Sequence, residues 1–195
     1  MDLFARRVHP LVKGFREIKQ LDKSISYRSE WLKYGAIGYI ACVEGYFRLL
    51  IADIIDSGEP FVERIGELKE IRFTPESVVA IHKKKVSLGH FVAHLLPLNG
   101  LSDINSHLSA LLATDYTRFF SAHPLSQWNT SPVGEVFPHL LAQVETLFKL
   151  RHMYAHELAT KERVPLRALE DLISSAAVLV RCTEEFVTES WQIRP

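Results

Sequence analysis

The chain carries no excess of charge of either sign and has few cysteines. Its 195 residues include 23 Lys and Arg, 23 Asp and Glu, and 9 His, which gives a formal net charge of +0. A neutral chain gains no whole-molecule attraction to nucleic acid, so RNA binding would need a local basic patch. The two cysteines, Cys42 and Cys182, lie in apolar helical contexts, which indicates a reducing compartment.

Long uncharged apolar runs are also missing. The longest one, 31–43, is interrupted by Lys33 and two glycines, and a bilayer span needs about 20 apolar residues. The N-terminal sequence MDLFARRVHPLVKGF has no apolar core followed by a cleavage site, so we read no signal peptide. Hydrophobic residues make up 47% and charged residues 24%, which excludes a disordered chain. We expect a cytoplasmic protein with no membrane partner.

Several catalytic and cofactor motifs are absent. The sequence contains no Gly-x-Ser-x-Gly, no Cys-x-x-Cys and no glycine-rich phosphate loop. Two histidine pairs, His90 with His94 and His152 with His156, have the i, i+4 spacing that can hold Zn²⁺ from one helix. Neither pair has the following Glu of a metalloprotease or a third ligand nearby in sequence. We therefore expect no metal and no cofactor.

The apolar residues follow a three-and-four rhythm almost throughout, and no alternating strand pattern appears. We expect helices over 2–21, 28–56, 61–71, a short segment from Pro75, two or three segments within 87–123, 134–160 and 165–191. Ser102 or Asp103 is the expected cap of the second helix in 87–123, and 121–133 is the best loop candidate.

This pattern predicts an all-α protein. We expect one domain, 1–195, built as an antiparallel bundle of four to five long helices. Its core would comprise 1–58 and 134–191, with 60–130 as an insert of short helices.

One charged residue interrupts the apolar face of the segment 140–158. That face reads Leu140, Val144, Leu147, Arg151, Tyr154 and Leu158. A guanidinium stays charged in proteins, so Arg151 needs an anion, a wet cleft or a partner chain, unless its stem packs and its head reaches water. His156 follows five residues later, at ~140° around the helix axis. Two facing copies of this helix could line one groove with both residue types, which favours a dimeric site.

The stretch Leu150-Arg151-His152 to Ala155-His156 resembles the hallmark of the HEPN superfamily (higher eukaryotes and prokaryotes nucleotide-binding domains). That hallmark is Arg, four to six residues, then His, near the end of a bundle helix. The upstream stretch 42–50, with Glu44, Tyr46 and Arg48, is similar to the acidic–aromatic–Arg pattern of stand-alone bacterial members. A second Arg-x4-His spacing, Arg118 to His123, ends at a proline in the turn-rich segment, and we interpret it as a chance match.

The resemblance implies a metal-independent endoribonuclease with a toxin–antitoxin or antiphage defence role. It implies an RNA substrate, a homodimer with a composite site, and an antitoxin or defence protein as a possible partner. Arg151 would bind the phosphate and His156 would act as acid or base. Glu44 would orient Arg151, while His152 and Tyr154 would line the groove. The alternative is a non-catalytic helical module for dimerisation or for binding a nucleotide or a partner protein.

Overall fold

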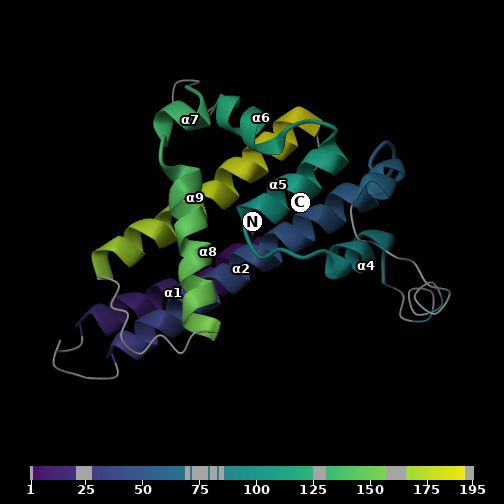
Figure 1. Cartoon of the computed structure of the whole chain (residues 1–195). Coiled ribbons are helices and arrows are strands. Elements are labelled where there is room, and N and C mark those ends of the chain that lie inside the picture. Colours follow the sequence, from purple (N-terminus) through teal and green to yellow (C-terminus); the bar gives the residue numbers. More distant parts are fainter. Residues whose placement is uncertain are drawn as a thin grey trace. The chain divides into compact units, whose positions relative to one another are not determined.

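The computed structural model describes residues 2–20, 28–68, 71, 79, 83, 86–124, 131–156 and 166–191 (Figure 1). The helices are α1 (Asp2–Gln20), α2 (Arg28–Asp56), η1 (Glu63–Glu67), α4 (Leu88–Leu95), α5 (Leu101–Leu112), α6 (Tyr116–Ala122), α7 (Val133–Val136), α8 (Leu140–His156) and α9 (Leu166–Trp191). No strand occurs among these described residues. They contain an isolated antiparallel β-bridge between Pro124 and Pro132. The all-α prediction is confirmed, and the bundle arrangement stays a prediction.

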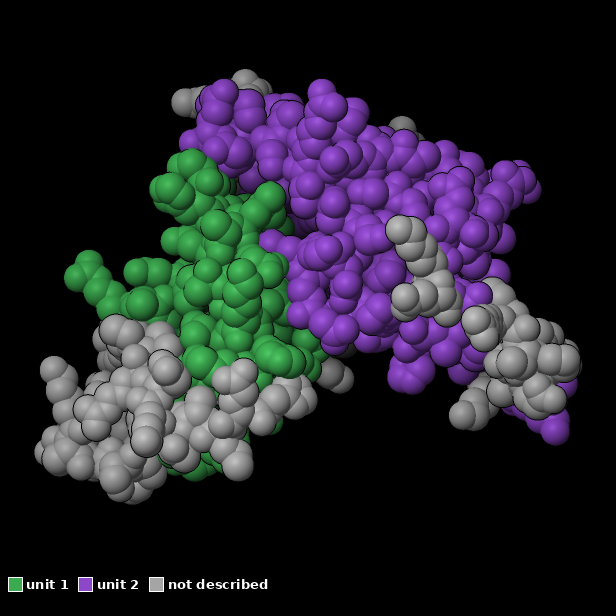
Figure 2. Space-filling model, in the orientation of Figure 1, with its two compact units in different colours: residues 1–45, 137–181 green, residues 46–136, 182–195 purple. Residues whose placement is uncertain are grey.

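The chain forms two compact units (Figure 2). Unit 1 comprises Met1–Gly45 and Phe137–Arg181, and unit 2 comprises Tyr46–Val136 and Cys182–Pro195. The boundaries fall within α2 and α9, so each of these helices contributes residues to both units. The sequence-based division into a core and an insert placed its boundaries elsewhere and stays a prediction.

Unit 1 is built from α1, α8 and the first parts of α2 and α9. Its buried apolar side chains recur at helical spacing and include Leu32, Tyr39, Val43, Val144, Leu147, Leu169, Ala176 and Leu179. The Ser175 hydroxyl donates to Gln143 Oε1 at 2.6 Å, which joins α9 to α8. Leu11 of α1 lies over Gly38 of α2, where an added Cβ would be 3.4 Å from Leu11 Cδ2. Within unit 1 these contacts join α9 to α8 and α1 to α2.

Unit 2 contains the rest of α2, the short helices and the end of α9. Helix α5 packs against α6 and η1, and α6 packs against α7. Buried aromatic rings connect α6 to α9, and Tyr116 Oη lies 2.7 Å from Thr183 Oγ1 in a fully buried hydrogen bond. Burial raises the pKa of Tyr116 above its ordinary value, so this hydroxyl stays neutral.

The stop predicted after residue 56 is confirmed. Helix α2 ends at Asp56, and Gly58 follows with φ of 91°, a left-handed conformation that glycine adopts without a Cβ clash. The amide of Gly58 donates to the Ile55 carbonyl at 3.2 Å, which satisfies one of the last carbonyls of the helix.

Three expected local features differ in the structure. In the described part of the segment 61–71, the helical residues form a 3₁₀ turn, Glu63–Glu67. The helix expected over 134–160 is divided into α7 and α8, because Pro138 lacks an amide and disfavours helical backbone at the preceding residue. Helix α5 begins at Leu101 with Gly100 as its N-cap, two or three residues before the expected caps Ser102 and Asp103, and Asp103 accepts instead from the Asn99 amide at 2.8 Å. The expected helix after Pro75 lies largely outside the described residues.

One described helix, Glu30–Asp56, is long and apolar enough to cross a membrane by length and composition. Half of its most apolar window is buried inside the protein, and a core helix of a soluble protein passes the same test.

Candidate active site

Helix α8 carries Arg151 on its buried face. Leu140, Val144 and Leu147 precede it at steps of four and three, and all three are buried. The side chain of Arg151 is 26% exposed, so most of it is covered while a part of it reaches solvent. The structure therefore places this cation at the edge of the unit 1 core, where an anion could reach it.

Glu44 of α2 faces Arg151 across unit 1. Glu44 Oε1 lies 3.6 Å from Arg151 Nη2, and the Glu44 side chain is 18% exposed. This separation is an ion pair and exceeds the distance of a hydrogen bond. It is the one ion pair of Arg151 within the part of the chain that the structure describes. A guanidinium has five N–H donors in a planar fork, so one carboxylate oxygen at this distance leaves donors for a phosphate.

Tyr154 lies one turn further along α8 and is half-buried. Lys33 Nζ of α2 sits 6.0 Å from the centroid of its ring, at the outer limit of a cation–π contact. Lys33 also forms an ion pair with Glu30 at 2.8 Å. Tyr154 and Arg151 thus both contact α2, and this places Lys33 as a second cation on the same side of α8.

The remaining predicted site residues lie at the end of α8. His152 is exposed, on a different face of the helix from Leu147 and Arg151. His156 is the last residue of α8, and its side chain lies outside the described residues. Its backbone position is ~7.5 Å along the helix axis from Arg151, as five helical residues require. The structure thus brings Glu44 to Arg151, places Tyr154 beside Lys33 one turn further along α8, and puts the backbone of His156 on the same helix.

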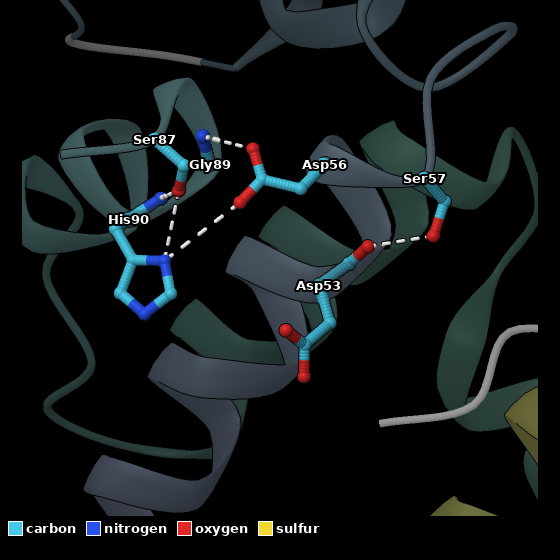
Figure 3. A network of polar contacts seen from close by, with 6 residues as sticks. All are labelled: Asp53, Asp56, Ser57, Ser87, Gly89 and His90. Carbon is cyan, nitrogen blue, oxygen red and sulfur yellow. Dashed lines mark hydrogen bonds and ion pairs between the residues drawn. The ribbon is translucent and has the colours of Figure 1, made fainter. Parts of the chain in front are cut away.

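A second polar network joins the end of α2 to the start of α4 (Figure 3). Asp56 Oδ1 accepts from the Gly89 amide at 2.8 Å, and Asp56 Oδ2 lies 3.7 Å from His90 Nδ1. Ser87 caps α4 by accepting from the His90 amide, and its hydroxyl lies 2.9 Å from the same Nδ1. A Ser–His–Asp triad needs Ser and Asp on opposite ring nitrogens. Here both contact Nδ1, so the network docks a helix N-terminus and does not form a nucleophile.

Gly89 is required for that docking. A Cβ at Gly89 would lie 2.2 Å from the Ala52 carbonyl oxygen and 2.7 Å from Asp56 Cγ.

The carboxyl group of Asp53 lies near the same network. Burial is the main cause that raises its pKa, while the charge of Asp56 adds to the rise and His90 opposes it. The negative side chains at the end of α2 therefore complement the N-terminus of α4.

One group of potential metal ligands was not foreseen from the sequence: His123, Glu185 and Glu189, in unit 2. The i, i+4 spacing of the two glutamates on α9 was a readable signal, but nothing in the sequence places His123 beside them. Among the described side chains, His90 and His94 belong to no such group, whereas the pair of His152 and His156 lies partly outside the described residues.

No protein-family model, curated protein or solved structure matches this chain.

Proposed function

We propose that this protein is a metal-independent endoribonuclease of the HEPN type. The single observation that carries the proposal is Arg151, a permanent cation on the apolar face of α8 whose side chain is partly exposed and which stands five residues before His156. A cation in such a place costs solvation free energy, which an arriving phosphate oxyanion would offset. The resemblance of this helix to the HEPN hallmark supports the same assignment.

The reaction uses the nucleophile that RNA supplies. A base removes the proton of the 2′-hydroxyl, the 2′-oxygen attacks the adjacent phosphorus, and the bond from phosphorus to the 5′-oxygen breaks. An acid then gives its proton to the leaving 5′-oxygen. The products are a 2′,3′-cyclic phosphate and a 5′-hydroxyl, with no redox change. Imidazole suits both proton transfers because its unperturbed pKa is near 6.5.

Two protomers would complete the site. Each would contribute one His156 and one Arg151, so that one imidazole acts as base and the other as acid while the two guanidinium groups hold the phosphate. The exposed aromatic residues Trp31 and Tyr34 of α2, which are 56% and 66% exposed, offer an apolar surface for a second copy of the chain. Glu44 is a positioning residue in this scheme, since it contacts Arg151.

The biological setting follows from the same resemblance. A cytoplasmic ribonuclease of this type would act in a toxin–antitoxin or antiphage defence system, and an antitoxin or defence protein would then restrain or trigger it. Because the net charge is neutral, RNA would be held by local cations such as Arg151.

The decisive experiment incubates the purified full-length protein with total RNA in the presence of EDTA. We expect cleavage by the wild type and at least 100-fold slower cleavage by Arg151→Ala and by His156→Ala. Arg118→Ala and His139→Ala are matched controls, because both residues are exposed and lie outside the site. Activity that needs a divalent ion, or that survives Arg151→Ala, would overturn the proposal.

One observation favours the alternative, a non-catalytic module for dimerisation or for nucleotide or partner binding. The ion pair with Glu44 already gives Arg151 an anionic partner within the protomer, which is what a structural arginine requires. Light scattering, together with the cleavage assay, separates the two. The module would be supported if the wild type is a dimer that cleaves no RNA and the double variant Trp31→Ser, Tyr34→Ser is a monomer.

A further inference from the structure

Three potential metal ligands from two elements converge in unit 2. His123 directly follows α6, while Glu185 and Glu189 lie one turn apart on α9. One ligand atom from each residue lies within 4.8 Å of the others. The two elements are linked independently by the buried hydrogen bond between Tyr116 and Thr183. The approach of the three side chains is therefore a consequence of the α6–α9 packing.

The environment of His123 indicates that this group binds a ligand. Its side chain is 9% exposed, so it is nine-tenths buried, and its Nε2 has no hydrogen-bond partner. Glu189 Oε2 lies 3.5 Å from Nε2, beyond the 2.7–3.2 Å range of an N–H to oxygen bond. A buried nitrogen without a hydrogen bond carries an unrecovered desolvation cost, which a bound ion would remove.

The His123 ring is held in place by its surroundings. It meets the ring of Phe186 edge-on, with centroids 5.2 Å apart. Its backbone amide donates to the Phe120 carbonyl at 3.1 Å, and its carbonyl accepts from the Val133 amide at 2.9 Å. The imidazole therefore needs little ordering to bind an ion, whereas Glu189, which is 49% exposed, can adjust its rotamer.

We propose that His123, Glu185 and Glu189 bind one divalent transition-metal ion, with Zn²⁺ as the representative ion. Zn²⁺ binds imidazole nitrogen and carboxylate oxygen at ~2.0–2.2 Å, so neighbouring ligand atoms in a tetrahedral site lie ~3.3–3.5 Å apart. The Nε2 to Oε2 distance of 3.5 Å already has that length. Two carboxylates neutralise the charge of the ion, and the imidazole favours Zn²⁺ over Mg²⁺ or Ca²⁺. Three protein ligands leave the fourth position to water.

Metal binding would fasten the end of α6 to the last turns of α9. Because the three ligands come together only in the folded chain, the ion binds the folded state and raises the melting temperature. The site lies in unit 2 and shares no residue with the proposed ribonuclease site in unit 1. Its test is a binding measurement, so its outcome is independent of whether the protein cleaves RNA.

The experiment uses the full chain, stripped with a chelator and then freed of it. ZnCl₂ alone is titrated in a calorimeter, CoCl₂ is titrated in a spectrophotometer, and thermal unfolding is followed with and without Zn²⁺. We expect one ion per chain, visible d–d absorption of Co²⁺, and a higher melting temperature with Zn²⁺. Glu189→Gln should weaken Zn²⁺ binding at least tenfold and abolish most of the thermal shift.

Two controls separate this site from other binding. Glu135→Gln removes an exposed carboxylate of unit 2, and His94→Gln breaks the i, i+4 histidine pair on α4. Both should bind Zn²⁺ as the wild type does. His123→Gln should lose binding, and if it fails to fold, Glu189→Gln decides, because that residue is half exposed. Failure of the wild type to bind Zn²⁺, or equal binding by wild type and Glu189→Gln, overturns the proposal.

Discussion

The ion pair between Glu44 and Arg151 makes a measurable contribution to the free energy of unfolding. At 3.6 Å, two unit charges attract by about 4.6 kcal/mol at an effective dielectric constant of 20 and by about 1.2 kcal/mol in water. Both side chains are roughly three-quarters buried or more, so the interaction lies between these limits and desolvation offsets part of it. We expect a coupling free energy of about 1–2 kcal/mol.

A double-mutant cycle measures that coupling directly. Glu44→Gln removes the negative charge, and Arg151→Met removes the positive charge while keeping most of the packed stem. Urea unfolding of the wild type, both single variants and the double variant, followed by circular dichroism, gives the four free energies. The sum of the two single losses should exceed the loss in the double variant by the coupling free energy.

The pair Glu145 and Lys149 on α8 is the matched control. Its atoms lie 3.8 Å apart, a similar distance, but the side chains are 40% and 74% exposed. Its coupling should not exceed about 0.5 kcal/mol, as for an exposed i, i+4 pair. If Glu44 and Arg151 are additive within about 0.5 kcal/mol, like the control, the assignment of Glu44 as a positioning residue fails.

Three further predictions concern residues of unit 2, with Gly45 of unit 1 as a control. Gly89→Ala should lower the free energy of unfolding by about 3 kcal/mol or more, because its Cβ would collide with α2, while Gly45→Ala, which has open space, should raise it by about 0.5–1 kcal/mol; urea unfolding distinguishes them. Asp53→Asn should raise the melting temperature at neutral pH. The raised pKa means that the folded state holds the Asp53 proton more tightly than the unfolded state, so ionisation of Asp53 at higher pH destabilises the fold. The increase in melting temperature of Asp53→Asn over the wild type should therefore shrink as the pH falls through that pKa towards 3.8. An increase that is independent of pH would contradict this. Thr183→Val should cost about 1–3 kcal/mol by leaving the buried hydroxyl of Tyr116 without its partner, and an unchanged urea midpoint would show that the bond contributes nothing.

Helix spacing in the sequence was informative wherever one apolar face repeats. It located α1, α2 and α9 within one residue at each end, because the apolar residues of these segments repeat at helical spacing. It missed the break before α8, since the apolar rhythm continues through 134–140 although Pro138 cannot continue a helix. Helical backbone is disfavoured at the residue before Pro138, and this signal should have outweighed the apolar rhythm.

The two sites differ in what a sequence can reveal. Arg151 was visible because one charge interrupts an apolar series on one helix. Glu44 was proposed as its partner from the family resemblance, and the structure places its carboxylate 3.6 Å from the guanidinium. His123 could not be foreseen beside Glu185 and Glu189, because this approach depends on how α6 packs on α9. Spacing reports neighbours on one helix and says nothing of contacts between distant helices.

The most direct test of the proposed ribonuclease is the chemistry of its product ends. A short RNA should be incubated in EDTA with wild-type protein, with Arg151→Ala and with His156→Ala, and the fragments analysed by mass spectrometry. We expect 2′,3′-cyclic phosphate and 5′-hydroxyl ends from the wild type and no fragments from either variant, with circular dichroism spectra unchanged. Fragments ending in 3′-hydroxyl and 5′-phosphate, or intact RNA with a folded wild type, would contradict it.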